Sequence, residues 1–575
     1  MKYTILLLLV LNISINGCFS QNHKEFVTEL DKFIGKEKDK KKVTGVSVSL
    51  AIDGQVLLSK GYGFANKKDN ITVDQHTQFA VGSISKLITS TAVLKLYSNN
   101  LIDIDKPYTY YVPEFSIKQH FKQKTPFTIR HLLTHFAGLP RVHAKGYSLI
   151  EERPLSRILD ISRDSYLIAP PALVSQYSDW GTDLLALLVE KVSGLKFEEF
   201  VAKEVFEPLQ MNESWYGSLQ ETKSYHKGVV SPTYEYSYVG SDGLNSTSLN
   251  LMNLGQMYLD DGKFDGKAYI MESISRDAKS AQFINAPLRF SKRQGFMWDI
   301  NQFSQYKRLS KGGIHEPFYS MLYVVPEYKM VLAICSNSNS SSSIHRSIYS
   351  EVIDHLSTIK KGIPSNISEP PLRRVSLSNE QISKVEGTYS TDQGIVDIQQ
   401  NRNKFKVTFD IMDKAIIGYP YSNNTIRIKA KILGLVPVKV MDVFWAEVDN
   451  EVVVGEQYSS GHRSLGGVKV QKKPIPENWE NAVGIYKVSN LLEDEYSHLE
   501  RLELKVNQYG ILELSGTTIY PTKFDIQLAI SPISDSLAII PGYSFEFFAG
   551  ETIELSENNG KTTLLISGYE LSKIN

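Results

Sequence analysis

The stretch FAVGSISKLITSTAVLKLY, Phe79–Tyr97, carries apolar residues at helical spacing on nearly every side. A helix that is apolar all round is normally buried inside a large domain. Its beginning is nevertheless polar, because Lys86 follows Ser83 by one turn. Residues three apart lie on one helical face, and a lysine whose pKa is lowered by burial can take a proton from a serine hydroxyl. The stretch therefore predicts a buried helix with a nucleophilic serine at its start. The same spacing recurs at Ser224 and Ser357, but neither begins a long apolar helix.

The order of strand-like and helical segments predicts a multidomain chain. With 575 residues, the chain is longer than a single hydrophobic core usually serves. Strand patterns flank Asp53-Gly54, a hairpin signal, and return after about residue 290, with helical patterns between them. This order predicts an α+β domain.

Beyond KKGIPSNISEPPLRR the pattern changes to short alternating strands in two blocks, one starting at KVEGTYS and the next at NAVGIYK. Two consecutive antiparallel β-barrels fit this spacing. We therefore expect a signal peptide (1–20), a catalytic domain (21–362), a linker (363–378) and two β-barrel domains (379–474 and 475–575). Whether the barrels bind a ligand or serve as packing units stays open.

The N-terminal segment MKYTILLLLVLNISINGCFS predicts export, because a lysine precedes an apolar run that is too short to span a membrane. Two processing routes fit it. Cleavage after Ser20 is one, and lipidation of Cys18 in INGC, with attachment to a membrane, is the other. Only Cys18 and Cys335 are present, so no intrachain disulfide is expected. Basic and acidic residues number 63 each, which gives no electrostatic argument for a nucleic-acid partner.

Several segments in this order, VGSISK, TIRHLLTHFAGLP, QYSDWG and KGGIHEPFYS, resemble the serine β-lactamase-like hydrolases. That group includes class C β-lactamases, D-Ala-D-Ala carboxypeptidases and lactamase-fold esterases. The resemblance covers roughly residues 25–360. It implies a β-lactamase/transpeptidase-like α+β domain with its site between a sheet and a helical region. We expect lipocalin-like barrels to follow this domain.

The resemblance also implies a role for each matching position. Ser83 matches the nucleophile, and Lys86 matches the lysine of the same motif. The backbone N–H groups of Ser83 and Ile314 would form the oxyanion hole. The other matching positions are Tyr177 of the second motif and Lys311, Gly312 and Gly313 of the third.

Two positions depart from the family pattern. Asp179 stands where the second motif normally has an asparagine that donates to a substrate amide, and an ionised carboxylate cannot donate. Gly312 replaces the threonine whose hydroxyl helps to bind a substrate carboxylate. Asp179 would also hold Lys86 charged, which favours Tyr177 as the base, although the choice between Lys86 and Tyr177 stays open.

These observations predict an exported serine hydrolase of a bacterial periplasm or cell envelope. It would act through an acyl-enzyme on a small-molecule or peptide substrate with an ester or amide bond, with weak or no β-lactamase activity. A D-amino-acid or peptidoglycan-related substrate is implied only by the resemblance. No metal or cofactor is implied, and His135 is expected to be structural. The alternative is a catalytically silent binding or scaffold protein of the envelope.

Overall fold

The computed structural model describes residues 23–574 apart from a set of short segments. The expected signal peptide, Cys18 and most of the expected linker lie outside the described residues. Among the helices of the described part, none combines the length and the apolar composition that a membrane crossing requires. The residues outside the description are 1–22, 122–124, 143–144, 146–153, 220, 232–238, 289–292, 304–305, 340, 360–371, 392–393, 411–413, 433–435, 449–450, 459–462, 492–496, 498, 519–523, 544–547, 559 and 575.

An antiparallel sheet of eight strands forms the centre of the N-terminal domain, in the order β11-β12-β13-β14-β15-β1-β2-β3. β1 (Gly45–Ile52) is buried along its whole length and pairs with β2 (Gln55–Asn66) in the hairpin that the sequence predicts. Asp53 and Gly54 make its turn, both at positive φ. The other strands are β3 (Ile71–Thr72), β11 (Arg293–Gln294), β12 (Asp299–Gln302), β13 (Lys307–His315), β14 (Phe318–Val325) and β15 (Met330–Ser336).

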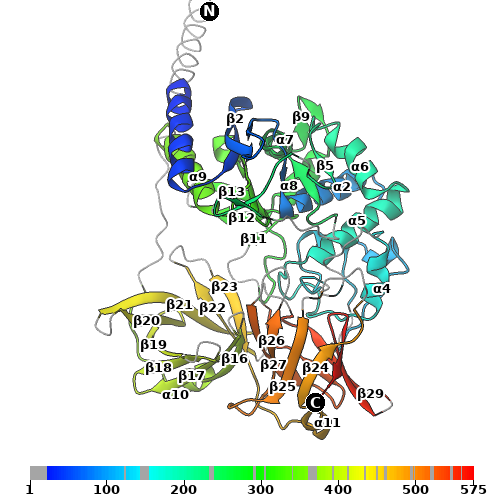
Figure 1. Ribbon diagram of the computed structural model, residues 1–575, viewed down its shortest axis with the longest axis vertical. Helices are drawn as coiled ribbons and strands as arrows, with labels where there is room; N and C mark the ends of the chain where they lie inside the picture. Colours follow the sequence, from blue (N-terminus) through cyan, green and yellow to red (C-terminus); the bar gives the residue numbers. More distant parts are fainter. Residues whose placement is uncertain are drawn as a thin grey trace, which may run out of the picture.

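Helices cover both faces of this sheet (Figure 1). On one face, α7 (Ser248–Leu259) lies against β1, β14 and β15, and α2 (Ser85–Ser98) and α5 (Asp179–Ser193) continue the same core. The helix of residues 23–40 and α9 (Ser342–Ile359) cover the other face. The α+β prediction is therefore confirmed. Shorter helices are α3 (Ile129–Leu133), α4 (Arg157–Arg163), α6 (Phe197–Val201) and α8 (Glu272–Ala278).

The stretch Phe79–Tyr97 is not one continuous helix, and the sequence-based prediction is wrong for its first six residues. Phe79–Ala80 forms the short strand β4, which pairs with β8 (Leu244–Ser246), and Gly82–Ile84 forms a 3-10 turn. The regular helix α2 begins only at Ser85. Gly82 has φ +54°, a left-handed conformation that suits glycine, and this turn breaks the helical pattern. Ser83 thus lies in the 3-10 turn, and Lys86 lies in the first turn of α2.

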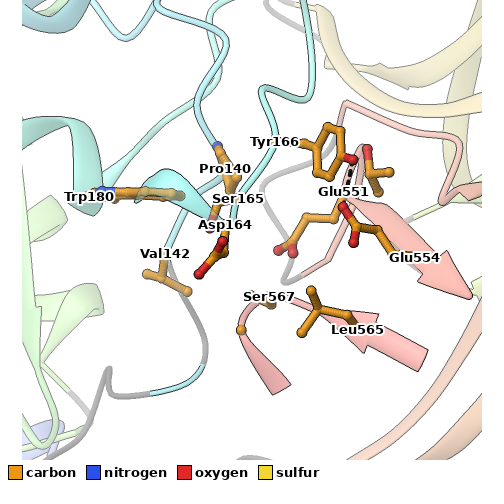
Figure 2. A pocket seen from close by; sticks show the side chains of 12 residues that line it. Pro140, Val142, Asp164, Ser165, Tyr166, Trp180, Glu551, Glu554, Leu565 and Ser567 are labelled. Carbon is orange, nitrogen blue, oxygen red and sulfur yellow. Dashed lines mark hydrogen bonds between the residues drawn. The ribbon is translucent and has the colours of Figure 1, made fainter. Parts of the chain in front are cut away.

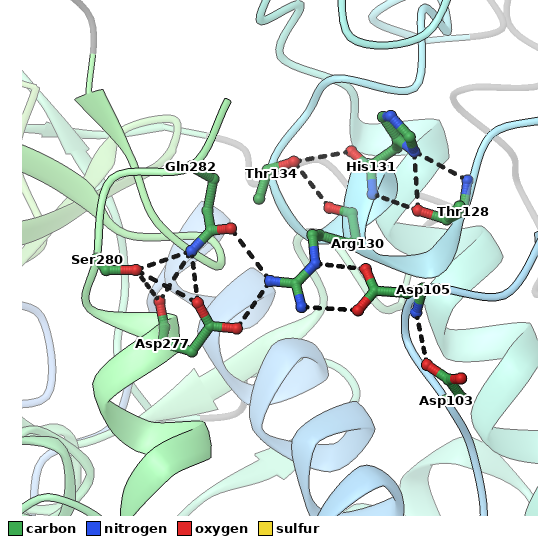
Figure 3. Close-up of polar contacts among 9 residues, drawn as sticks. All are labelled: Asp103, Asp105, Thr128, Arg130, His131, Thr134, Asp277, Ser280 and Gln282. Atoms are coloured by element: carbon green, nitrogen blue, oxygen red, sulfur yellow. Dashed lines mark hydrogen bonds and ion pairs between the residues drawn. The ribbon is translucent and has the colours of Figure 1, made fainter. Parts of the chain in front are cut away.

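An arginine network that is partly exposed holds α3, the helix that leads into the segment around His135 (Figure 3). The Arg130 guanidinium forms two hydrogen bonds with the Asp105 carboxylate, at 2.6 and 3.0 Å, and one with Asp277 on α8 at 2.7 Å. A planar fork of this kind fixes orientation as well as distance. The network therefore joins two distant parts of the chain to the helix that precedes the catalytic region.

Two closed antiparallel β-barrels of eight strands follow the N-terminal domain, as the sequence predicts (Figure 1). The first consists of β16 (Gly387–Thr391), β17 (Gly394–Asn401), β18 (Lys404–Phe409), β19 (Lys414–Tyr421), β20 (Thr425–Ile432), β21 (Val436–Val448), β22 (Glu451–Gln457) and β23 (Arg463–Lys469). The second consists of β24 (Gly484–Val488), β25 (Leu499–Val506), β26 (Leu512–Thr518), β27 (Phe524–Pro532), β28 (Leu537–Ile539), β29 (Thr552–Asn558), β30 (Lys561–Ile566) and β31 (Tyr569–Lys573).

The weak repeat in the sequence has a structural counterpart in the two barrels. Each begins with a short helix, α10 (Asn379–Val385) or α11 (Glu477–Asn481), followed by a strand with a buried tyrosine. Tyr389 donates to the Val385 carbonyl at 2.7 Å, and Tyr486 donates to the Ala482 carbonyl at 2.5 Å. The tyrosine therefore ties the end of each helix to the first strand of its barrel.

Both barrels pack against the N-terminal domain. Ile168 and Val174 of that domain form one buried cluster with Val453 and Val468 of the first barrel. Glu554 of the second barrel accepts hydrogen bonds from Lys118 at 2.8 Å and Tyr166 at 2.6 Å. Apolar and polar contacts thus connect the three domains.

A pocket lies where the second barrel meets the N-terminal domain (Figure 2). Pro140, Val142 and Trp180 line it from the N-terminal domain, opposite Glu551 and Glu554. Glu551 is buried, and burial raises its pKa to about 8, so its carboxyl group is largely protonated at pH 7. The second barrel therefore faces the start of α5 across this pocket, next to the segment that carries Tyr177.

We expect Ile168→Ala to loosen the docking of the barrels. The change leaves a cavity in the cluster shared with Val453 and removes the contact with Gly550 of the second barrel. The loss should be about 2–5 kcal/mol of unfolding free energy, measured by chemical denaturation. Ile158→Ala, a buried isoleucine within the N-terminal core, is the matched control. Only Ile168→Ala should increase protease cleavage between the domains. Equal cleavage in both variants would contradict this role.

Candidate active site

The hydroxyl oxygen of Ser83 accepts hydrogen bonds from two titratable side chains. Tyr177 donates a hydrogen bond to Ser83 Oγ at 2.6 Å, and Lys86 Nζ donates to the same oxygen at 3.1 Å. Ser83 lies in the 3-10 turn before α2, Lys86 in the first turn of α2, and Tyr177 two residues before α5. Three residues that the sequence predicts as catalytic are thus brought within hydrogen-bond distance. This is the geometry of a serine nucleophile with adjacent bases.

Lys86 is completely buried and has three polar contacts. Its ammonium lies 2.6 Å from Asp179 Oδ1 and donates to the Ser241 carbonyl at 2.8 Å, besides its contact with Ser83. Burial alone would lower the pKa of Lys86, but the charges of Asp179, Tyr177 and Asp242 outweigh it and raise the pKa above its usual value. Lys86 is therefore a cation at neutral pH, as the sequence argument from Asp179 requires.

Tyr177 is held in place by the residues around it. Its ring lies 4.7 Å from the ring of His135, and the Ser178 N–H donates to His135 Nδ1 at 3.2 Å. Ser178 then caps α5 by accepting from the Gly181 N–H at 2.8 Å. Burial raises the pKa of Tyr177 to about 12, partly offset by Lys86. His135 is thus structural in the sense expected, but the residue that it positions belongs to the site.

Strand β13 supplies the third motif beside the nucleophile. The backbones of β13 and the 3-10 turn approach so closely that a Cβ on Gly313 would lie 1.8 Å from the Val81 carbonyl oxygen and 3.0 Å from Ser83 N. A Cβ on Gly82 would lie 2.7 Å from Ile314 N. Only glycine permits this approach, which brings the N–H groups of Ser83 and Ile314 to one place. That arrangement suits an oxyanion hole.

Lys311 lies on the same strand, with its ammonium 5.2 Å from the centre of the Tyr177 ring. It is buried, like Lys86, whose ammonium lies 4.9 Å from that ring. Two buried lysine side chains therefore approach the Tyr177 ring. Positive charge at such a distance stabilises the tyrosinate relative to the phenol and favours negative charge that develops on a substrate.

The two positions that depart from the family pattern lie in the site but differ in what they do. Asp179 is committed to Lys86 by the 2.6 Å ion pair, so it is not placed as a donor to a substrate. Gly312 has no side chain to offer. A Cβ built on it would lie 2.9 Å from Met321 Sδ, so a larger residue there requires that flexible side chain to move.

The turn Gly240–Asp242 belongs to the site, although sequence reasoning missed it. Ser241 contributes its main-chain carbonyl to Lys86, and a backbone contact leaves no residue-type signal in a sequence. Asp242 lies 2.9 Å from Nδ1 of His315, which directly follows Ile314 on β13. The turn therefore contacts both the helix with Lys86 and the strand with the oxyanion donor.

Comparisons with known proteins agree with the fold of the N-terminal domain. Residues 30–355 match the family model described as Beta-lactamase. Penicillin-binding protein 4* of Bacillus subtilis (strain 168) is 24% identical over 404 residues, covering 65% of this chain and 84% of that protein. The chain spans a smaller share of other curated relatives. It covers 56% of the length of one such protein and 40% of the length of another.

Two solved structures share the fold over a larger part of the chain. The octameric penicillin-binding protein homologue from Pyrococcus abyssi is 22% identical, with a TM-score of 0.52, 77% of this chain covered and 100% of that chain. The structure of SurE with D-Leu is 16% identical, with a TM-score of 0.58 and corresponding coverage of 78% and 100%. At these identities the likeness concerns the fold alone.

We expect Asp179→Asn to shift the pH dependence of Ser83 reactivity to lower pH. Asp179 raises the pKa of both Lys86 and Tyr177, and either must lose its proton before it can accept one from Ser83. Reactivity should therefore rise with pH in the wild type, and the rise should begin about one unit lower or more in the variant. The rate of labelling by a fluorophosphonate between pH 5 and 10 measures this.

Asp242→Asn is the informative comparison for this prediction. Asp242 raises the pKa of Lys86. The profile of Asp242→Asn should therefore also shift to lower pH if Lys86 is the base. An unchanged profile for Asp179→Asn would contradict both assignments.

Proposed function

Because the chain belongs to the β-lactamase family, we propose that it is a serine hydrolase that cleaves an ester or amide bond through an acyl-enzyme. The observation that carries this proposal is the position of Ser83 Oγ, 2.6 Å from the Tyr177 hydroxyl and 3.1 Å from Lys86 Nζ. A serine with only a packing role has no need of two titratable partners at this distance. Their joint presence supports proton transfer.

In the acylation step, Ser83 Oγ attacks the substrate carbonyl carbon while its proton passes to the deprotonated member of the Tyr177–Lys86 pair. The carbonyl oxygen becomes an oxyanion that accepts from the N–H groups of Ser83 and Ile314. Collapse of this intermediate breaks the bond to the leaving group, which takes up the proton. Lys311 adds positive charge beside Tyr177 throughout.

In the deacylation step, a water molecule attacks the acyl carbon after giving its proton to the same base. The second tetrahedral intermediate collapses to release the carboxylic acid, and Ser83 Oγ recovers its proton. The same residues thus serve both half-reactions, and the sequence of steps uses only groups of this chain and water.

The substrate class that the site favours is a small acyl ester. An ester needs only the nucleophile, the base and the oxyanion donors. A penicillin also presents an amide and a carboxylate, for which Asp179 and Gly312 provide neither a donor nor a hydroxyl. Because curated relatives are named penicillin-binding proteins and SurE was solved with D-Leu, esters and peptides of D-amino acids belong in the first substrate panel.

We also propose that the protein acts outside the cytoplasm, in the periplasm or cell envelope. The support is the pattern of its first twenty residues, which lie outside the described part of the structure. Cys18→Ala distinguishes the two processing routes, because it abolishes membrane attachment by lipidation but leaves cleavage after Ser20 possible. The measurement is the fraction of protein found with the membranes after fractionation of cells that produce the wild type or Cys18→Ala.

We expect Ser83→Ala to abolish covalent labelling by a fluorophosphonate and all turnover, with the fold unchanged. The substitution removes one hydroxyl and adds no volume, so thermal unfolding should stay close to that of the wild type. Intact mass spectrometry measures the labelling. Ser85→Ala is the matched control, since Ser85 lies two residues on and its hydroxyl donates to the Gly82 carbonyl instead of meeting the bases. Full labelling of Ser83→Ala would reject Ser83 as the nucleophile.

We expect hydrolysis of p-nitrophenyl esters of short acids to be much faster than hydrolysis of a chromogenic cephalosporin. Each missing hydrogen bond to the β-lactam should cost about 1–3 kcal/mol, or about tenfold to a hundredfold in rate. Asp179→Asn combined with Gly312→Thr should raise β-lactam acylation, provided that Met321 yields to the new side chain. A wild-type protein that prefers the cephalosporin would refute this substrate class.

The alternative, a catalytically silent binding protein, makes the opposite prediction for the same measurements. It requires that wild-type protein is not labelled at Ser83 and that none of the ester and D-peptide substrates is turned over. A single labelling experiment on the full chain therefore separates the two functions.

A further inference from the structure

Side chains of α5 and α2 hold the turn Gly240–Asp242 at its first residue through two hydrogen bonds, one on each side of the Gly240 Cα. The Gly240 N–H donates to Asp183 Oδ1 at 2.8 Å, and the Gly240 carbonyl accepts from Thr89 Oγ1 at 2.6 Å. Asp183 lies on α5 and Thr89 on α2, so the turn is held between the two helices of the active site. The next residue, Ser241, presents its carbonyl to Lys86 Nζ at 2.8 Å.

The turn packs so tightly against α5 that its first residue must be glycine. A Cβ on Gly240 would lie 2.7 Å from Ala186 Cβ and 3.0 Å from Asp183 Oδ1. Asp183 itself has no exposed surface. It follows Asp179 by one helical turn, so the two carboxyl groups lie on one face of α5. One contacts Lys86 directly, and the other contacts the turn that contacts Lys86.

We propose that Asp183 is a positioning residue of the active site: through Gly240 it holds the Ser241 carbonyl against Lys86 and so fixes the ammonium beside Ser83. This inference rests on the proposed hydrolase function and extends it to a residue that touches no reacting atom. Thr89 performs the same task at the adjacent peptide unit, by donating to the Gly240 carbonyl. Loss of the hydrogen bond from Gly240 to Asp183, or of that from Thr89 to Gly240, lets the Ser241 carbonyl move away. Lys86 then loses one of its three hydrogen-bonding partners.

The protonation state of Asp183 adds a pH dependence to this role. Burial raises the pKa of Asp183 to about 8, although the Ser241 side chain, the Gly240 N–H and Lys86 lower it. The charged or titratable groups that interact with it are Lys86 from α2, Asp179 from α5 and Tyr216 from β5 (Trp215–Tyr216). Above pH 8 its ionisation adds a second negative charge to a region that already contains Asp179. That charge disfavours deprotonation of Tyr177 and Lys86, so the wild-type rate should lag at high pH.

Four full-length variants test the inference. Asp183→Asn keeps the size and the acceptor for Gly240 but cannot ionise. Asp183→Leu removes the acceptor for the Gly240 N–H, and Thr89→Val removes the donor to the Gly240 carbonyl. Thr91→Val is the matched control, because Thr91 is a buried threonine of α2 whose hydroxyl contacts Leu87 and Tyr258 instead of the turn. The rate of fluorophosphonate labelling and kcat/KM for a small ester are measured from pH 6 to 10.

At pH 7 Asp183→Asn should stay within about threefold of the wild type, whereas Asp183→Leu and Thr89→Val should fall by about tenfold to a hundredfold and Thr91→Val should change little. Above pH 8 the ratio of Asp183→Asn to wild type should rise, to about threefold to tenfold at pH 9.5. A merely structural Asp183 would give no pH-dependent ratio. Equal rates for Asp183→Leu, Thr89→Val and wild type, or a flat ratio, overturn the proposal.

Crystal structures of the wild type and Thr89→Val, and of Asp183→Leu if it folds, give a readout that does not depend on activity. The distance from Ser241 O to Lys86 Nζ, 2.8 Å in the wild type, should exceed hydrogen-bond range in the variants and remain in Asp183→Asn. If the wild type is not labelled at all, the proposed hydrolase function fails, and this distance alone then decides the positioning role. An unchanged distance overturns it.

Discussion

The ammonium group of Lys86 is a fully buried charge, and most features of the active site follow from the need to keep it paired. A buried cation is tolerated only when its partners replace the water that it loses. Here the partners come from three separate parts of the chain: the 3-10 turn with Ser83, the N-terminus of α5 with Asp179, and the turn with Ser241. The ion pair between Lys86 and Asp179 therefore joins α2 and α5 in addition to their apolar packing.

The same ion pair also decides the chemistry. With Asp179 at 2.6 Å, Lys86 remains protonated at neutral pH, and its charge lies near Tyr177. A cation at that place stabilises a tyrosinate, so Lys86 assists Tyr177 as a base even if it never gives up a proton itself. Asp179 stands where the family motif has an asparagine, and its carboxylate is paired with Lys86. It therefore offers no amide donor to a substrate.

Close approach between backbones is the second constraint. Gly82 and Gly313 allow the 3-10 turn and β13 to lie in contact, and Gly240 allows the turn beside Lys86 to lie against α5. Each contact brings a main-chain N–H or carbonyl to the site. The barrels add a third layer, because Glu554 of the second barrel accepts hydrogen bonds from Lys118 and Tyr166 and lines a pocket opposite Pro140 and Trp180. The C-terminal barrels thus pack on the domain that contains Tyr177.

The sequence by itself determined the chain order of the α+β domain and the two barrels, because period-2 and helical patterns, the Asp53-Gly54 turn and the internal repeat are local signals. It also predicted Ser83, Lys86, Tyr177 and Lys311 as candidate site residues, since each lies in a short motif that can be found by residue type and spacing. It extended the helix of Lys86 too far toward Phe79, because apolar periodicity does not reveal a 3-10 turn imposed by Gly82.

Only the tertiary structure decided how these motifs meet. The hydrogen bonds of Ser241 and Gly240 are made by backbone groups, which have no residue signature, and Asp183 and Thr89 reach them across a separation of more than fifty residues. The packing of the barrels on the catalytic domain likewise depends on surfaces assembled from distant segments. Contacts of this kind form only when the chain folds and brings distant residues together. A short pattern along the sequence therefore does not reveal them.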